Sequence, residues 1–248
     1  MLKTPKPQDL LDNILLRSLS VEARTHLFPF MQRIYLPLGH VVYDPGVPIE
    51  NVYFPSTCVV SCLYTMQDGS TAEIALVGND GVIGVTSFLG GCAPPHRAIA
   101  QIAGDAIKVP ARLIRAEFAR NGPLQHILLC YTQALIAQIA QTAVCNRLHS
   151  VEQRLCRWLL LCHDRVEGTE IRMTQEYIAN MLGGRRESVT VAAGHLQDLS
   201  LIRYSRGHIT IVDRKGLELM VCECYQTVKD EYERLIGQGG RANQQKDR

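Results

Sequence analysis

The sequence contains none of the short motifs that mark common enzyme classes. Its 248 residues include no nucleophile elbow, no phosphate-binding loop and no HExxH metal motif. The pair His163-Asp164 is the nearest approach to catalytic chemistry, and no third residue stands at motif spacing from it. We therefore expect no enzymatic activity.

Segments that direct a chain to or across a membrane are also lacking. The N-terminal residues contain no apolar signal-peptide core, and no uninterrupted apolar run approaches the roughly 18 residues that a membrane span needs. These absences predict a cytoplasmic protein without a membrane partner. The formal net charge is only +2, so any nucleic-acid binding must come from a local basic patch.

Cysteine is plentiful, with nine residues in the chain, but no two of them form a CxxC pair. Cys222 and Cys224 stand in a segment with helical periodicity, where residues two apart point in different directions and do not readily hold one metal ion. We expect buried, reduced thiols, and we expect neither a metal nor a cofactor.

The first region of the chain has the pattern of a β domain. Residues 33–109 are rich in β-branched residues and are divided by turn sequences, among them Asp44-Pro45-Gly46 and Gln67-Asp68-Gly69. Short strands at this spacing are typical of an antiparallel sandwich or barrel. The sequence predicts a sensor-like β-barrel domain over residues 1–110.

Helical periodicity replaces this pattern over residues 111–149. A short helix is predicted over 111–120, and a longer one runs from Pro123 to about Leu148. One stripe of the longer helix follows alternating steps of four and three residues, the spacing of a coiled-coil seam. The stripe consists of Leu124, Leu128, Tyr131, Leu135, Gln138 and Thr142, and continues to Cys145. We expect it to be a homodimer interface; the alternative is that it packs on the chain's own β domain.

The third region, residues 150–236, is predicted to be a compact helical domain with a hairpin. Ser150 begins a capping box for a helix to about Cys162, so the hinge between domains falls at 148–150. Two short helices, a β-hairpin and one amphipathic helix over 215–236 follow. Residues 237–248 are predicted to be disordered.

The two short helices and the hairpin have the layout of a winged helix-turn-helix. Thr174 is a suitable N-cap for the first helix, Gly183 can end it in the left-handed conformation, and a second helix begins near Arg185. In this motif the first turns of the second helix touch base edges, and the hairpin touches phosphates. The predicted DNA-contacting residues are Thr174, Gln175, Arg185, Arg186, Glu187, Ser188, Thr190, Val191, Arg203, Arg206 and His208.

These motifs together resemble the Crp/Fnr family of bacterial transcription regulators. The stretch TQEYIANMLGGRRESVT is similar to that family's TRxxIAxxLGxxRExV signature, and GHVVYDPGVPIENVYF is similar to its cyclic-nucleotide-type barrel. The resemblance implies an α+β protein with an N-terminal jelly-roll barrel, a long dimerisation helix and a C-terminal winged helix-turn-helix. It also implies a dimer on palindromic double-stranded DNA, base reading by Arg186 and Glu187, and RNA polymerase as a candidate partner.

The sequence departs from that family at several positions. A further DNA-contacting arginine of the family falls at Val191, and Gly81-Val82-Ile83-Gly84 lacks the acidic partner of a bound ribose. We place the candidate effector pocket at Gly84, Arg97 and Ala98, and we expect a small-molecule effector other than cyclic AMP. The sequence leaves haem and redox sensing open. It also leaves open a sensor that acts through protein contacts, with the helix-turn-helix as the contact surface.

Overall fold

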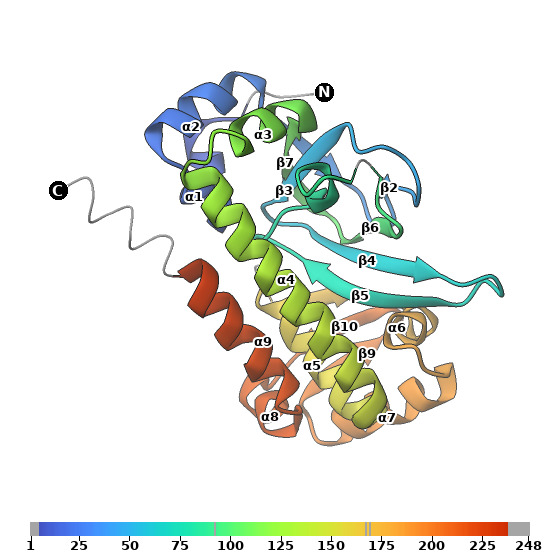
Figure 1. The fold of residues 1–248 in the computed structure, drawn as a ribbon. Coiled ribbons are helices and arrows are strands. Elements are labelled where there is room, and N and C mark those ends of the chain that lie inside the picture. Colours follow the sequence, from blue (N-terminus) through green and yellow to red (C-terminus); the bar gives the residue numbers. More distant parts are fainter. Residues whose placement is uncertain (1–4, 92, 167, 169, 238–248) are drawn as a thin grey trace.

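The computed structural model describes residues 5–91, 93–166, 168 and 170–237. An N-terminal unit of helices and strands and a C-terminal helical unit lie at opposite ends of one long helix, α4 (Figure 1). The architecture is the mixed α+β type that the sequence predicts.

Short helices that the sequence analysis did not predict cover one end of the β domain (Figure 1). They are η1 (Pro7–Asp12), α1 (Ile14–Arg17), α2 (Val21–Leu27) and η2 (Phe28–Phe30). The fully buried Asn13 fastens them to the strands, because its side-chain amide donates hydrogen bonds to the carbonyls of Pro55 at 2.8 Å and Gly81 at 2.9 Å. The same side chain caps α1 by accepting from two backbone N–H groups.

The predicted antiparallel β domain is present as two separate sheets, not as one closed barrel. One sheet has the order β1 (Gln32–Leu36), β7 (Gly104–Pro110), β3 (Asn51–Pro55). The other has the order β2 (Val41–Tyr43), β6 (Arg97–Ile102), β4 (Val59–Thr65), β5 (Thr71–Val77). A short 3-10 turn, η3 (Val85–Ser87), lies between β5 and β6. Both sheets contribute to one continuous apolar core.

Helix α3 (Ala111–Phe118) follows the last strand, and α4 runs from Pro123 to Leu148. The stripe predicted as a dimer seam faces inward instead. Leu124, Leu128, Tyr131 and Gln138 are at most 2 % exposed, and Leu135 and Thr142 are half-buried. Strand β5 and the C-terminal helix α9 (Cys224–Tyr232) cover this stripe. The prediction of these residues as the dimer interface is wrong for this reason, and the alternative, that the stripe packs on its own chain, describes them.

A different face of α4 is left uncovered. Leu129, Ile136, Ala140 and Val144 recur at steps of seven and four residues and are exposed, Ile136 by 61 %. We call these four residues the outer face of α4. Helix α4 is long and apolar enough to cross a membrane by length and composition alone, a property that core helices of other proteins share.

The C-terminal unit begins with α5 (Val151–His163), whose capping box at Ser150 is present as predicted. It continues through α6 (Gln175–Leu182) and α7 (Arg186–Asp198). A small antiparallel sheet has the order β8 (Glu170–Arg172), β10 (His208–Ile211), β9 (Ile202–Ser205). Strand β8 is an addition to the predicted hairpin.

The last predicted helix is in fact two helices. α8 (Arg214–Met220) ends at Val221, whose extended backbone turns the chain, and α9 begins at Cys224. A π-helical turn, η4 (Glu233–Gly237), follows. Leu217 of α8 and Tyr225 of α9 are both buried in the core. Of the predicted disordered tail, residues 238–248 lie outside the described residues.

The buried amide of Gln138 links α4 to both of its neighbours. It donates to the carbonyl of Leu76 in β5 and accepts from the hydroxyl of Tyr232 in α9, each at 3.0 Å. Replacing Gln138 with Ala removes one hydrogen bond from each of these two buried partners. We expect the free energy of unfolding to fall by about 2 to 4 kcal/mol in urea denaturation. The exposed Gln133→Ala on the same helix should change it by less than about 0.5 kcal/mol; equal losses in the two variants would contradict this role of Gln138.

Candidate nucleic-acid interface

Helices α6 and α7 form the helix-turn-helix that the sequence predicts. The Thr174 hydroxyl caps α6 by accepting from the backbone N–H of Tyr177 at 3.3 Å, and Gly183 ends it with a φ of +59° in the left-handed region. Arg185 is the N-cap of α7. The inner residues Val189, Ala192, Ala193 and Leu196 are buried, so one face of α7 is fixed against the core.

The opposite face of α7 is open to solvent at its first turns. Arg185, Arg186, Glu187, Ser188, Thr190 and Val191 are all exposed, as predicted for base-contacting positions. Val191 is 73 % exposed, although an apolar side chain gains nothing from water there. The Thr190 hydroxyl donates to the side chain of Gln175 at 2.8 Å, so the start of α6 and the first turns of α7 present one continuous polar surface.

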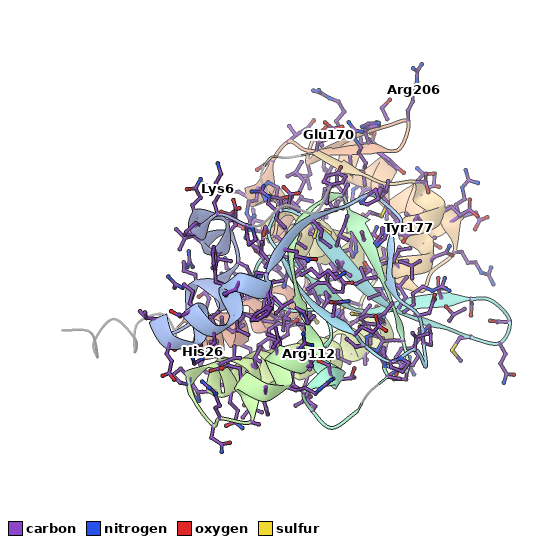
Figure 2. All side chains as sticks on the ribbon, turned by 90° about the horizontal axis from the view of Figure 1, so that it is seen from above. Lys6, His26, Arg112, Glu170, Tyr177 and Arg206 are labelled. Carbon is purple, nitrogen blue, oxygen red and sulfur yellow. The ribbon has the colours of Figure 1, made fainter. Side chains whose placement is uncertain are left out.

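The hairpin of β9 and β10 forms the wing. Its two tip residues, Arg206 and Gly207, have φ values of 50° and 81°, the pair of positive values that a tight hairpin turn needs. Figure 2 shows Arg206 projecting from this tip, away from the rest of the molecule. Arg203 is also exposed on β9, so the wing carries two cations suited to phosphate contact.

His208 differs from the other predicted contacts because it has a partner within the chain. Its ring nitrogen Nδ1 pairs with the carboxylate of Glu170 on β8. This hydrogen bond lowers the pKa of Glu170 below its usual value. A phosphate would have to compete with that carboxylate, so His208 is a weaker candidate contact than Arg206.

Side chains from α5 hold the helix-turn-helix in place. Arg154 donates to the carbonyl of Leu182, the last residue of α6, at 2.7 Å. Glu152 pairs with His195 on α7. Sequence patterns gave no sign of these positioning residues, because each acts on a partner more than 25 positions away.

The helix-turn-helix also rests on the N-terminal domain, through contact of α6 with β5. Beneath it lies Glu73, a buried carboxyl that accepts a hydrogen bond from Ser61. Burial raises the pKa of Glu73 to about 7. The amide of Gln101, in β6, meets the sulfur of Met173 just before α6. The N-terminal domain therefore supports the helix-turn-helix through α6 and the residues just before it.

The three residues predicted as an effector pocket each engage other parts of the chain. Arg97 is paired with Asp44 at 2.7 Å, and both side chains are about half exposed. Ala98 is fully buried in β6 opposite Cys62. Gly84 takes a left-handed φ of 104° and lies against Val52. Arg97 of the candidate pocket thus already has a carboxylate partner within the chain.

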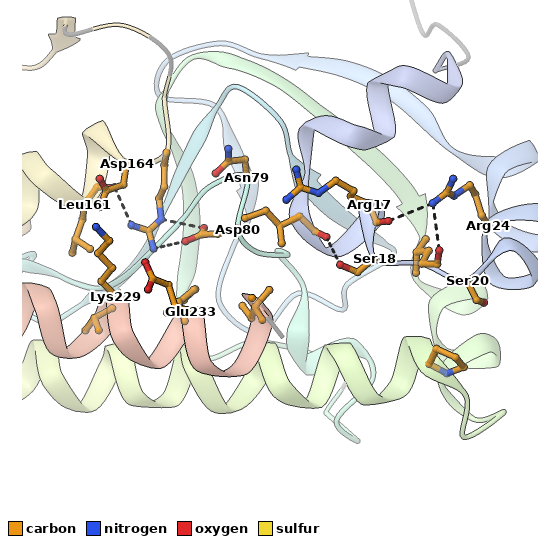
Figure 3. A pocket seen from close by; sticks show the side chains of 18 of the residues that line it. Arg17, Ser18, Ser20, Arg24, Asn79, Asp80, Leu161, Asp164, Lys229 and Glu233 are labelled. Carbon is orange, nitrogen blue, oxygen red and sulfur yellow. Dashed lines mark hydrogen bonds and ion pairs between the residues drawn. The ribbon is translucent and has the colours of Figure 1, made fainter. Parts of the chain in front are cut away.

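A cleft lies in another part of the molecule, between the N-terminal helices and the pair α4–α9 (Figure 3). Its volume is about 1020 Å³, and its walls carry charges of both signs. Arg165, at the end of α5, crosses it to pair with Asp80 at 2.7 Å. Sequence reasoning missed this cleft because its walls come from five separate parts of the chain.

Comparison with known proteins agrees with this geometry. Residues 153–220 match the family model of the Crp-like helix-turn-helix domain. The global nitrogen regulator of Nostoc sp. is 25 % identical over 180 residues, 68 % of this chain and 80 % of that protein. The global nitrogen regulator of Synechococcus elongatus is 24 % identical over 188 residues, 72 % of this chain and 85 % of that protein.

Solved structures show the same fold. FixK2 from Bradyrhizobium japonicum superposes with a TM-score of 0.66 at 18 % identity, over 77 % of this chain and 98 % of that one. A Crp/Fnr-type transcriptional regulator from Eubacterium rectale also gives 0.66, at 17 % identity over 83 % and 96 %. The two-sheet domain, the long helix and the winged helix-turn-helix occur here in that order, and the helix-turn-helix matches its family model. This chain thus contains a Crp-like helix-turn-helix domain, and over most of its length it is similar to transcription regulators of the Crp/Fnr type.

Proposed function

We propose that two copies of this chain bind a two-fold symmetric DNA site, each placing the start of α7 in the major groove. The observation that carries the proposal is the exposed first turn of α7 on a helix whose other face is buried. Helix-turn-helix dimers place such helices in successive major grooves, about one helical turn apart. The DNA site is two-fold symmetric, and the exposed residues of α7 read its sequence.

Two classes of contact follow from the side-chain chemistry. Arg186 can pair with guanine O6 and N7, Glu187 can accept from cytosine N4, and Val191 can touch a thymine methyl. The remaining exposed groups suit phosphates: Thr174 and Gln175 at the start of α6, Arg185 before α7, and Arg203 and Arg206 on the wing. Only the first class carries sequence information.

The outer face of α4 supports the dimer. Leu129 is 46 % exposed, Ile136 61 % and Val144 44 %, all on one side of a 26-residue helix. An exposed apolar stripe of this kind is unfavourable in water and is typical of a helix that pairs with a second copy. The inner face is occupied by β5 and α9, which leaves the outer face for a partner.

Changing Leu129 and Ile136 together to Glu should yield monomers, because two pairs of like charges would be buried at the interface. Sedimentation velocity should show the loss of the dimer, and affinity for the DNA site should fall with it. Leu219→Glu is a matched control, since Leu219 is 88 % exposed on a different helix, α8. A double variant that sediments as the wild type does would exclude the outer face as the interface.

Arg186→Ala and Arg206→Ala should weaken DNA binding in different ways. Loss of Arg186 should cost about 1 to 3 kcal/mol on the cognate site and much less on random DNA. Loss of Arg206 should weaken binding to both and reduce the slope of log affinity against log salt by about one. Gel-shift titrations across salt concentrations separate these outcomes.

Arg112→Ala is the control for these titrations, because Arg112 is exposed on α3, remote from the wing in Figure 2. Equal damage by Arg186→Ala on cognate and random DNA would make Arg186 a phosphate contact. A DNA affinity that does not change with salt concentration would count against DNA recognition and favour a protein-contact surface.

Regulation by cyclic AMP does not suit this chain. Arg97 already pairs with Asp44, and Val82 offers no acceptor where the family holds a ribose hydroxyl. An unmade buried hydrogen bond costs roughly 1 to 3 kcal/mol. Isothermal calorimetry should therefore show no binding in the micromolar range. Asp44→Ala frees Arg97 and is the informative companion variant; micromolar affinity in the unaltered chain would refute this expectation.

A further inference from the structure

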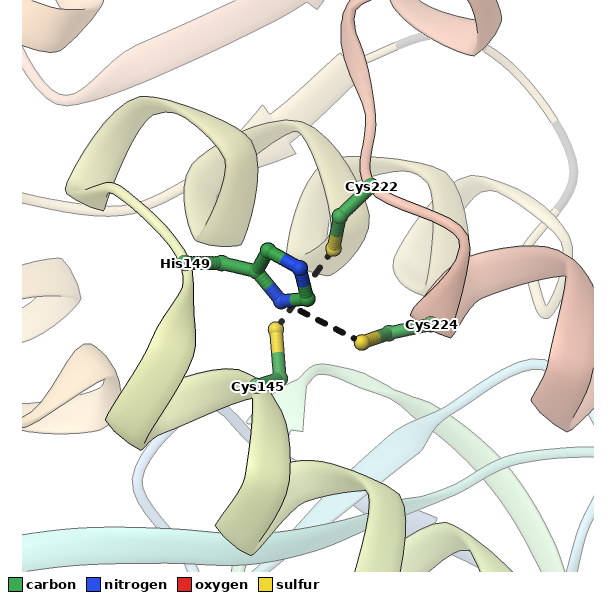
Figure 4. A group of neighbouring side chains, drawn as sticks. All are labelled: Cys145, His149, Cys222 and Cys224. Carbon is green, nitrogen blue, oxygen red and sulfur yellow. Dashed lines mark hydrogen bonds between the residues drawn. The ribbon is translucent and has the colours of Figure 1, made fainter.

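Four side chains of types that can bind a metal ion converge at the C-terminal end of α4 (Figure 4). Cys145 lies in the last turn of α4 and His149 directly after that helix. Cys222 lies in the link between α8 and α9, and Cys224 is the first residue of α9. Their ligand atoms all lie within 4.8 Å of one another. The three cysteines are buried, and none is in a disulfide.

The separations suit a shared tetrahedral ion better than a disulfide. The sulfurs of Cys145 and Cys222 are 3.6 Å apart, and the sulfur of Cys224 is 3.4 Å from Nδ1 of His149. Two sulfurs on a tetrahedral zinc ion lie about 3.8 Å apart, and a sulfur and a nitrogen about 3.6 Å. A disulfide needs about 2.05 Å and uses only two of the four groups.

The surrounding side chains orient these ligands. The second ring nitrogen of His149, Nε2, lies 3.4 Å from the carboxylate of Glu223, which leaves Nδ1 directed at the sulfurs. A carboxylate behind a metal-binding histidine is a recurrent feature of zinc sites, because it fixes the tautomer and the ring plane. The amide of Gln141 donates to the sulfur of Cys224 at 3.1 Å. Hydrogen bonds of this kind stabilise a thiolate.

We propose that Cys145, His149, Cys222 and Cys224 bind one tetrahedral divalent metal ion, with Zn²⁺ as the preferred ion. Three sulfurs and one imidazole are the soft donor set of structural zinc sites, and no oxygen ligand for a harder cation is present among them. Binding releases the three thiol protons to solvent, and the histidine binds as the neutral ring. The occupied site carries one net negative charge. The buried guanidinium of Arg157, bonded to Thr142 one turn before Cys145, offsets part of it.

The site would act as a clamp at the hinge between domains. His149 immediately precedes Ser150, the N-cap of α5, so one ligand sits at the junction of the long helix and the DNA-binding unit. The other side of the site belongs to the segment that leads into α9, which packs along α4. A bound ion therefore fixes the C-terminal end of α4 to the start of α9. This stands whether or not α7 binds DNA.

The expectation that no metal binds rested on an unbroken helix through residues 222–224, and that premise is wrong. Val221 is extended, Cys222 lies in the link, and only Cys224 is helical. Side chains two positions apart in such a link can point to the same centre. Cys222 and Cys224 supply two of the four ligands. Cys145 and His149 supply the other two, because residues four apart lie on the same side of a helix end.

The test uses the full-length chain, purified in reductant without chelator. We expect about one zinc per chain by elemental mass spectrometry. After zinc removal, titration with Co²⁺ should give the intense thiolate charge-transfer and visible bands of a tetrahedral sulfur site. Cys222→Ser and His149→Ala should lose the zinc and weaken those bands. Cys130→Ser is the matched control, since Cys130 lies on the same helix but outside the cluster, and it should keep both.

A milder variant keeps the test decisive if the cysteine variants do not fold. Glu223→Gln retains all four ligands and should lower zinc affinity about 10- to 100-fold by removing the partner of His149. Glu218→Gln, an exposed carboxylate in the same segment that pairs with Arg214, should leave it unchanged. Absence of zinc together with a cobalt spectrum free of thiolate bands would overturn the proposal. So would a Cys145–Cys222 disulfide in the protein as isolated from cells.

Discussion

The structure depends on the burial of the inner face of α4. Tyr131 and Gln138 on that face meet β5 on one side and Tyr232 of α9 on the other, and the amide of Gln138 bonds to both. Breaking this contact exposes apolar surface and also removes hydrogen-bond partners from buried polar groups. These contacts therefore fix the position of α4 relative to both the β domain and α9. Its outer face is then the one surface of α4 left for a second copy.

Helices α4 and α9 lie against each other in opposite directions, and each end of the pair carries a distinct feature. The large cleft adjoins the start of α4 and the end of α9, with Pro123 and Tyr232 in its wall. The cysteine and histidine cluster joins the other ends, where α4 meets the hinge. Anything that binds at either end acts on the same rigid pair. The DNA-binding unit begins two residues beyond the end of α4, at Ser150.

Within the DNA-binding unit, rigidity and exposure are divided between the two faces of α7. The buried face fixes the helix axis; Glu152 of α5 pairs with His195 of α7, and Arg154 of α5 bonds to the end of α6. The exposed face then presents Arg186 and Glu187 without any structural role of their own, so they are free to pair with bases. The wing tip is held by two residues with positive φ, which places Arg206 beyond the body of the domain.

The sequence alone determined the elements whose signals are local. The caps at Ser150 and Thr174, the left-handed Gly183 and the turn at Arg206-Gly207 predicted the helix-turn-helix and wing, because each depends on neighbours within a few residues. The tertiary structure decided which stripe of α4 is buried, since two stripes of that helix are apolar and only β5 and α9 distinguish them. It also decided that Arg97 is paired and that four ligands meet at the hinge. The hydrogen bonds across these contacts join residues between 53 and 94 positions apart, a distance at which side-chain periodicity carries no information.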